Sequence, residues 1–397
     1  MACPGRRTVV DMTDAWGSET SDYEADDFDD SCDADGAEGV TTVRISGAGD
    51  LLDALPRMLG FVPTNSAVLV ALRPPRDRVT LTIRVDLPVR RYETSCARLL
   101  AGHAQRAGAT SAVLVIYDDR PPPAARRWPG ASLTRELRTA LRNHGGMRLA
   151  DSVLVSNGRG RSLLCTDDRC CPVEGHPLRG DLEPSAFAAA LVANGAALLP
   201  SRAALAASVA GPTGAAADDI GRLQAMAADE LTARVAAGEP EAGVRAETVA
   251  LFRAALGRSA SGPSLSDEGV ARLLAGLVDI GARDVVLGWA GEKDTDGLLA
   301  LLLALAPRAA EPLNVPVLTA LAWVAYARGD GGLANIAVAG ALSTDPSYTM
   351  AQLVASGLES GLHPRHVQAV SREISRTGSD DPQLIGGPDD PADPLTG

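Results

Sequence analysis

Thiol and imidazole groups are concentrated in one short stretch, residues 164–177. It contains Cys165, Cys170, Cys171 and His176, half of the six cysteines of the chain and one of its five histidines. Thiolates and imidazoles are preferred ligands of Zn²⁺, and four of them complete a tetrahedral site. Paired cysteines in a reducing compartment also serve as redox pairs. The stretch therefore offers two kinds of chemistry, beside the plain interpretation that its thiols only pack.

The spacing of these cysteines favours a pair over a four-ligand site. Residues 166–169 are polar and suit a tight turn, so we expect Cys165 and Cys170 to face each other across a hairpin, about 4.5–5.5 Å apart at Cα. That distance allows a reversible disulfide or a shared metal ion. Cys170 and Cys171 are only about 3.8 Å apart at Cα, below the usual disulfide range of about 4.4–6.8 Å. Strand alternation is expected to turn Cys171 to the opposite face and into the core. Packing thiols remain the leading interpretation.

Acidic residues at two strand ends form a second candidate site. Asp118 and Asp119 follow one predicted buried strand, and Arg84 and Asp86 end another. Ligands of open α/β sheets collect at the carboxyl ends of strands, where paired acids can bind Mg²⁺ or act as acid and base. The alternative, which turn acids favour, is that Asp118 and Asp119 cap the next turn and pair with Arg120 or other nearby arginines.

Charge is distributed unevenly along the chain. The formal net charge is −13, yet residues 11–38 carry twelve acids and no Arg or Lys, and residues 379–397 carry five acids. The chain between them is close to neutral, which argues against a general nucleic-acid-binding face. Both ends are poor in large apolar groups, so we expect disordered acidic tails at residues 1–39 and 378–397.

Several familiar motifs are missing from the sequence. It has no phosphate-binding G-x-x-x-x-G-K-[ST], no G-x-G-x-x-G after a strand, no G-x-S-x-G and no H-E-x-x-H. We therefore predict no cofactor, and zinc at the cysteine stretch remains an alternative. The longest apolar run, residues 298–306, is shorter than the ~20 residues of a spanning helix. With no signal peptide at the start, the cytoplasm is the expected compartment and no membrane contact is expected.

Strands and helices alternate before the cysteine stretch, and only helices follow it. Periodicity predicts strands at 41–45, 66–72, 78–87, 112–117, 152–156 and 161–165, with helices at 50–59, 93–107 and 133–143. The fold class is therefore a mixed α/β sheet with flanking helices at 40–182, followed by an all-α domain at 183–377. The cysteine stretch lies at the boundary between the two.

One helix pair resembles a tetratricopeptide unit. Gly329-Asp330 is followed by the small residues Ala334 and Ala341 and then by Asp345-Pro346. Small residues at this spacing let two antiparallel helices approach closely. Because one unit alone matches, we expect a structural helical cap and not a long binding groove.

Seven segments of the chain together resemble an actinobacterial family known only as domain-of-unknown-function family 4192. They are Ile45-Ser46-Gly47 with Asp50-Leu51-Leu52, Leu59-Gly60-Phe61-Val62-Pro63 with Ser66, Arg84-Val85-Asp86-Leu87-Pro88, Tyr117-Asp118-Asp119, Cys165 with Cys170-Cys171-Pro172 and Gly175, Leu199-Pro200-Ser201-Arg202, and the region from Gly329-Asp330 to Asp345-Pro346. The resemblance covers about residues 41–370. It implies the domain limits and no known reaction, cofactor or partner.

The leading functional prediction is a cytoplasmic binding or scaffolding module that engages a protein partner through its helices or its sheet edge, and not an enzyme. One alternative is a small-molecule binder or enzyme at the sheet edge around Asp86, Asp118 and Asp119. The other is a thiol- or metal-responsive regulator that uses the cysteine stretch. We expect no nucleic-acid partner.

Overall fold

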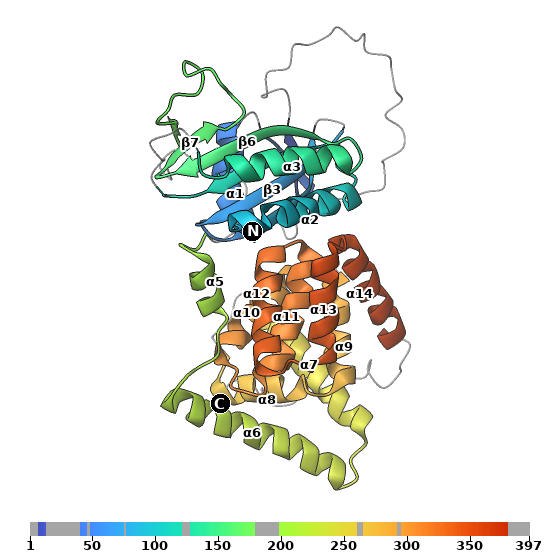
Figure 1. The fold of residues 1–397 in the computed structure, drawn as a ribbon. Coiled ribbons are helices and arrows are strands. Elements are labelled where there is room, and N and C mark those ends of the chain that lie inside the picture. The colour runs from blue at the N-terminus through green and yellow to red at the C-terminus, as the bar shows by residue number, and fades with distance from the viewer. Residues whose placement is uncertain are drawn as a thin grey trace. The chain divides into compact units, whose positions relative to one another are not determined.

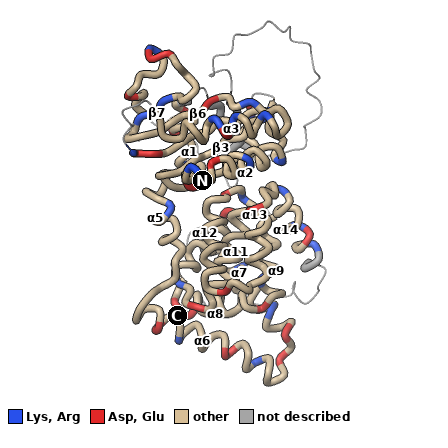
Figure 2. The backbone as a smooth tube through the Cα atoms, viewed as in Figure 1, with Lys and Arg blue, Asp and Glu red and all other residues tan. Residues whose placement is uncertain are grey.

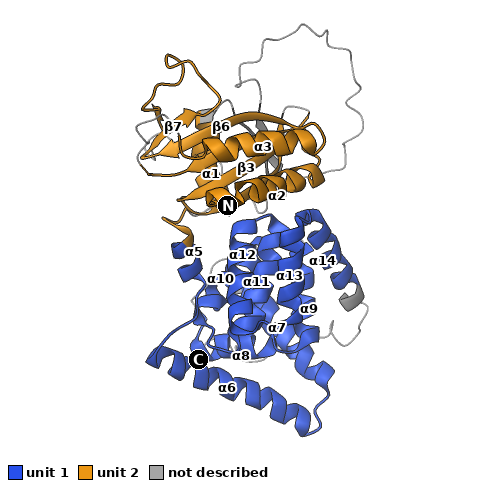
Figure 3. Cartoon of the chain, viewed as in Figure 1, with its two compact units in different colours: residues 1–5, 203–397 blue, residues 6–202 orange. Residues whose placement is uncertain are grey.

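The computed structural model describes residues 7–12, 40–45, 48–74, 77–120, 128–178, 198–259, 265–291 and 295–379 (Figure 1). The chain divides into two compact units, one within residues 6–202 and the other within residues 203–397 (Figure 3). Basic and acidic positions are interspersed along the backbone of both units (Figure 2). The first unit holds a β-sheet with helices, and the second is helical in its described part.

The sheet of the first unit has six strands in the order β4-β3-β5-β6-β7-β8. Only β5 and β6 run parallel, while the other neighbouring strands are antiparallel. The mixed α/β sheet predicted from periodicity is therefore confirmed. The strands are β3 (Ser66–Arg73), β4 (Arg78–Asp86), β5 (Ser111–Tyr117), β6 (Arg148–Ser156), β7 (Arg159–Ser162) and β8 (His176–Pro177).

The burial of each strand follows from its sequence. Every residue of β5 is buried, and in β3 only Arg73 is exposed, as a continuous apolar run requires in the middle of a sheet. The alternating strand β4 is only partly buried and lies at the edge. This order places the carboxyl ends of β4 and β5 at the same end of the sheet, because Ser66 of β3 pairs with both Asp86 and Tyr117. We call this end the carboxyl edge of the sheet.

Two helices cover one face of this sheet. Their apolar stripes, with Leu100 on α2 (Glu93–Arg106) and Leu137 on α3 (Ala131–Asn143), pack against inward residues of β3 and β5 (Figure 1). This is the amphipathic pattern expected of surface helices. A third helix, α1 (Ala48–Leu59), lies next to β7, and a short 3₁₀ turn, Arg90–Tyr92, precedes α2.

The strand predicted at residues 41–45 forms, but not in the main sheet. It is β2 (Val40–Ile45), which pairs in parallel with β1 (Arg7–Met12) as a separate two-stranded sheet. Residues 7–12 therefore have regular structure within a segment predicted to be disordered, because Thr8-Val9-Val10 supplies β-branched residues. The rest of residues 1–39, and residues 380–397, lie outside the described residues, so disorder there stays a prediction.

The second unit contains a series of helices around one core, and no strand occurs in its described residues. Phe252, Leu273, Leu302 and Leu321 are among the fully buried or nearly buried members of this core. No described helix has the length and apolar character to span a membrane. The helices are α5 (Arg202–Ser208), α6 (Ala215–Ala236), α7 (Glu241–Ser259), α8 (Asp267–Gly276), α9 (Ile280–Gly288), α10 (Thr295–Leu305), α11 (Asn314–Arg328), α12 (Gly331–Thr344), α13 (Thr349–Ser360) and α14 (Pro364–Ser379), with 3₁₀ turns at Trp289–Gly291 and Ala306–Arg308.

The predicted helix pair is α11 and α12, joined by Gly329-Asp330. Gly329 ends α11 in the left-handed conformation, and the Asp330 carboxylate accepts the amide of Leu333 to cap α12. The hydroxyl of Tyr326 on α11 donates to the carbonyl of Gly357 at 2.9 Å, which ties α13 to the pair. The helical class predicted for this part of the chain is therefore confirmed.

Candidate metal and thiol site

The cysteines lie in a loop between the last two strands of the sheet. β6 and β7 are joined by Asn157-Gly158, both at positive φ, as a two-residue hairpin turn requires. β7 ends at Ser162 and β8 begins at His176. We call residues 163–175 the cysteine loop. It leaves the sheet and returns to the far side of β7, because β8 pairs with Arg159 and Gly160.

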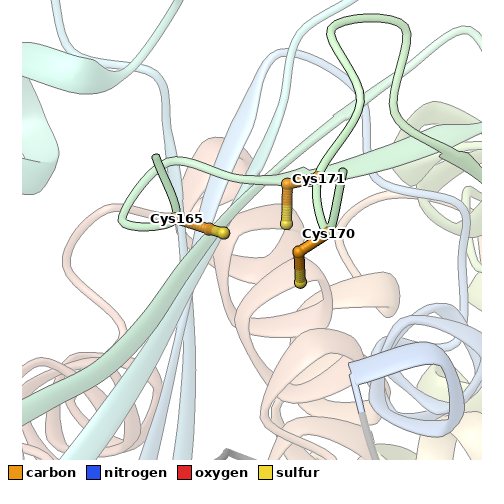
Figure 4. A group of neighbouring side chains, drawn as sticks. All are labelled: Cys165, Cys170 and Cys171. Atoms are coloured by element: carbon orange, nitrogen blue, oxygen red, sulfur yellow. The ribbon is translucent and has the colours of Figure 1, made fainter. Parts of the chain in front are cut away.

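Three thiols of the cysteine loop come together. The sulfur atoms of Cys165, Cys170 and Cys171 all lie within 4.8 Å of one another (Figure 4). All three are free thiols, and they differ in exposure: Cys171 is buried, Cys165 is partly exposed and Cys170 is exposed. We call them the three-thiol group. No other cluster of three or more potential metal ligands occurs among the described residues.

The predicted arrangement of these cysteines is wrong in two respects. Cys165 and Cys170 do not lie on opposite strands of a hairpin, because β7 ends at Ser162, and Cys171, which is buried as predicted, does not point away from the other two thiols. The amides of Cys170 and Cys171 both donate to the carbonyl of Asp167, at 3.2 and 2.8 Å. This is a single helical turn, in which successive side chains differ by about 100° and not by 180°. Adjacent thiols can therefore converge.

A buried carboxylate fixes the start of the loop. Asp151 on β6 accepts the hydroxyl of Ser162 at 2.6 Å and the amide of Ser152 at 2.7 Å. Burial raises the pKa of Asp151, while these two hydrogen bonds oppose the rise. The oxygen of Ser162 in turn accepts the amides of Leu164 and Cys165, at 3.2 and 3.1 Å. The first cysteine is thus held by a chain of hydrogen bonds that begins inside the sheet.

Two arginines of β7 fix the other end of the loop. Arg161 donates to the carbonyl of Cys171 at 2.8 Å, and its guanidinium stacks on the Trp128 ring with 4.7 Å to the centroid. Arg159 donates to the carbonyl of Gly175 at 2.8 Å. Planar guanidinium groups hold backbone carbonyls in a defined orientation. The backbone of Cys171 is therefore fixed independently of any metal ion.

A glycine allows the loop to return close to β7. Gly175 has φ +73°, and a Cβ atom there would lie 2.9 Å from the carbonyl oxygen of Gly160. Its amide donates to the carbonyl of Pro172 at 2.9 Å, which closes the turn after the cysteines. Both the backbone angle and the close approach require glycine at this position.

The buried thiol of the group is protonated at neutral pH. Burial, followed by hydrogen bonding to Cys165, raises the pKa of Cys171 to about 11. A metal ion that binds this sulfur must displace its proton. Metal binding and proton release are therefore coupled at Cys171.

The predicted fourth ligand does not join the group. The Nε2–H of His176 donates to the carbonyl of Cys170 at 2.7 Å, so this exposed imidazole supports the loop backbone. The described part of the chain brings no His, Asp or Glu into the three-thiol group.

The separation of the three thiols suits one soft metal ion. With Zn–S bonds of about 2.3 Å, a tetrahedral site places its sulfur atoms about 3.8 Å apart. The sulfur atoms lie within 4.8 Å of one another, so they need to approach by at most about 1 Å to reach this spacing. Thiolates select zinc and copper(I) over the hard ions Mg²⁺ and Ca²⁺. The residues present therefore fit a zinc ion with three protein ligands and one external ligand.

The acidic residues of the second candidate site are each satisfied by a close neighbour. Arg84 contacts Asp86 at 2.6 Å, and Asp118 contacts Arg120 at 2.5 Å. Asp119 accepts the amide of Asn157 at 2.9 Å. The strand register places these acids at one edge of the sheet, as the sequence predicts. Their hydrogen bonds match the alternative in which they support turns.

Asp118 is ionised in the folded protein. Asp118 is 1% exposed, and burial alone would raise the pKa of its carboxyl group, but the hydrogen bonds and charge of Arg120 outweigh burial and lower that pKa. The carboxylate also accepts the amide of Arg120 at 3.0 Å. Both oxygens of Asp118 are therefore used within its own turn.

The residues that hold the cysteine loop were not predicted from the sequence. They are Asp151 on β6 and Arg159, Arg161 and Ser162 on β7. One signal was present: a charged and polar Arg-Gly-Arg-Ser run follows the Asn-Gly turn, where a buried strand would have apolar residues. The loop residues that they bind could not be predicted, because those contacts form only when the folded chain returns along β7.

Comparison with known proteins identifies the family alone. The family model described as Domain of unknown function (DUF4192) matches residues 49–365. Neither the search of curated proteins nor the search of solved structures found a match. The match includes the sheet, the cysteine loop and most of the helical unit, so the chain belongs to the DUF4192 family.

Proposed function

We propose that this protein is a metal-responsive regulator that binds one zinc ion through Cys165, Cys170 and Cys171. The observation that carries the proposal is the convergence of three free sulfur atoms within 4.8 Å in one loop. Buried packing thiols need no such convergence. Three thiolates supply the soft ligand set that Zn²⁺ prefers.

The surroundings of the thiols support a binding role. Asp151 and Ser162 hold the amide of Cys165, and Arg161 holds the carbonyl of Cys171. Hydrogen bonds that orient the ligands of a metal commonly contribute about 10–100-fold to its affinity. A loop that is fixed from both ends loses less conformational entropy when the ion binds.

A responsive site is favoured over a purely structural one. Structural zinc sites normally have four protein ligands, whereas three leave a position for water or an external ligand. Cys170 is exposed, so ion and solvent can reach the group. Free thiols persist in a reducing compartment, so the proposal places the protein in the cytoplasm.

Cobalt(II) titration tests the proposal, because thiolate ligands give Co²⁺ an intense near-ultraviolet charge-transfer band. The protein is prepared with Cys3 and Cys32, which lie outside the described residues, replaced by serine. One ion per chain is expected, displaced by zinc. The triple variant Cys165→Ser, Cys170→Ser, Cys171→Ser should lose the band, while Cys96→Ser, a cysteine outside the group, should keep it. A band that survives in the triple variant would refute the proposal.

A further inference from the structure

The three cysteines differ in exposure, and this difference bears on how the proposed metal site is controlled. Cys170 is exposed, Cys165 is intermediate and Cys171 is 8% exposed. Oxidants in solution reach exposed thiols first. The most accessible sulfur of the group therefore lies within 4.8 Å of two further thiols.

We infer that hydroperoxides regulate this site by joining Cys165 to Cys170, which removes two of its three ligands and releases the metal. The inference rests on the proposed zinc site for its consequence, the loss of metal. It rests for its chemistry only on the three thiols. The oxidant that switches the site is a peroxide, either hydrogen peroxide or an organic hydroperoxide.

The reaction balances with peroxide as the only oxidant. The Cys170 thiolate attacks one peroxide oxygen, the O–O bond breaks, and a sulfenic acid and hydroxide (or alkoxide) form. The Cys165 thiolate then attacks the Cys170 sulfur, forming the S–S bond and expelling hydroxide. The two thiolates lose two electrons in total and the peroxide gains them. Two protons from solvent neutralise the anions released, and zinc leaves as Zn²⁺ without a change of oxidation state.

Geometry selects Cys165 as the partner of Cys170. A Cys170–Cys171 bond would join adjacent residues, whose Cα atoms are about 3.8 Å apart, below the usual disulfide range. Cys171 is also buried, and its backbone is held by Arg161. Cys165 lies outside the helical turn that contains the other two cysteines, so its side chain can approach Cys170 across the loop. Cys171 is left as a single thiol, too few ligands to keep zinc.

Peptide mapping after peroxide treatment tests this inference. Zinc-loaded full-length protein, with Cys3 and Cys32 replaced by serine, is treated with hydrogen peroxide, alkylated and digested, while a chromophoric chelator reports released zinc. We expect one equivalent of zinc to leave as the link between Cys165 and Cys170 forms, and a dithiol reductant to restore binding. Cys96→Ser should behave like the parent protein.

Two variants separate this inference from the proposed function. Cys165→Ser removes the thiol that attacks the oxidised sulfur of Cys170. In this variant peroxide should therefore oxidise Cys170 further, to sulfinic acid, and no disulfide should form. The metal-free parent protein should form the Cys165–Cys170 link even if the protein proves unable to bind zinc. Protein that never binds zinc but forms the link would refute the proposed function alone. Zinc binding without the link, or a link between Cys170 and Cys171, would overturn the inference.

Discussion

The cysteine loop and the carboxyl edge of the sheet both contain residues that could bind a ligand, but the hydrogen bonds around those residues differ. At the edge, each acid has a partner close by: Asp118 binds Arg120 and Asp119 binds the amide of Asn157. In the cysteine loop, the backbone is held by β6 and β7 while the three sulfur atoms are left facing one another. Residues that satisfy one another locally stabilise a turn, whereas residues held by others are available for a ligand.

Whether the hydrogen bonds of a site end on its functional groups or on its backbone is therefore more informative about ligand binding than the residue types. At the edge, hydrogen bonds end on the functional groups of Asp118, which leaves them no free capacity. In the loop, the strong hydrogen bonds from β7 and Ser162 end on backbone amides and carbonyls, and the thiols have only weak sulfur contacts with one another and with the carbonyl of Asp167. The predictions below test this contrast.

The largest expected effect is the loss of metal binding in Cys171→Ser. Because orienting partners alone contribute about 10–100-fold, removal of a direct ligand should weaken zinc binding by at least about 100-fold. Competition with a chromophoric chelator measures the affinity. Asp118→Asn, at the other site, should leave it unchanged. Equal zinc affinities in Cys171→Ser and the parent protein would contradict the claim that the thiols of the cysteine loop bind the metal ion.

The next effect is a strong pH dependence of metal affinity. With the pKa of Cys171 raised to about 11, its proton must be displaced over the whole neutral range. This thiol alone should therefore strengthen apparent zinc affinity about tenfold for each pH unit gained, until pH approaches that pKa. Titrations between pH 6.5 and 8.5, with the zinc affinity of the competing chelator corrected at each pH, measure the slope. A flat profile would show that Cys171 is not a ligand.

A smaller effect is expected on stability from Gly175→Ala. The substitution places a Cβ in left-handed backbone 2.9 Å from the Gly160 oxygen, and strain of this kind costs about 1–3 kcal/mol. Gly146→Ala is the matched control, since Gly146 has φ +71° and nothing within 4 Å of the added atom. Denaturant unfolding compares the two variants. If both lose the same free energy of unfolding, the contact between the loop and β7 contributes nothing.

The smallest effect concerns Asp118. Because Arg120 lowers the pKa of this carboxyl in the folded state, the pair stabilises the fold above the ordinary pKa, and that stabilisation is lost as pH falls through the lowered pKa. Arg120 is 72% exposed, so Asp118→Asn should cost only about 1 kcal/mol at pH 7. The loss should shrink in acid. A loss that grows as pH falls would contradict the assigned direction.

The sequence predicted the central strands of the main sheet well but did not predict the pairing of β2 with β1. Strands β3 and β5 were recognisable because they are continuous apolar runs buried on both faces. The partner of β2 was not, because pairing with β1 joins segments separated by residues 13–39. Strand pairing of this kind depends on contacts that no local periodicity records.

The candidate site was predicted in composition but not in geometry. The residue types of Cys165, Cys170 and Cys171 suggested a thiol or metal site, and the same three come together. Their geometry was predicted incorrectly because strand alternation was extended past Ser162, where the hydroxyl accepts loop amides and β7 ends. That hydroxyl is held by Asp151, eleven residues earlier, a contact that depends on the folded sheet.

X-ray absorption at the zinc edge of protein loaded with one equivalent of zinc tests the central claim most directly. Three convergent thiols predict a shell of three sulfur atoms at about 2.3 Å and one lighter oxygen or nitrogen ligand. A shell made only of oxygen and nitrogen would place the ion elsewhere on the chain and contradict the claim that the cysteine loop is the metal site.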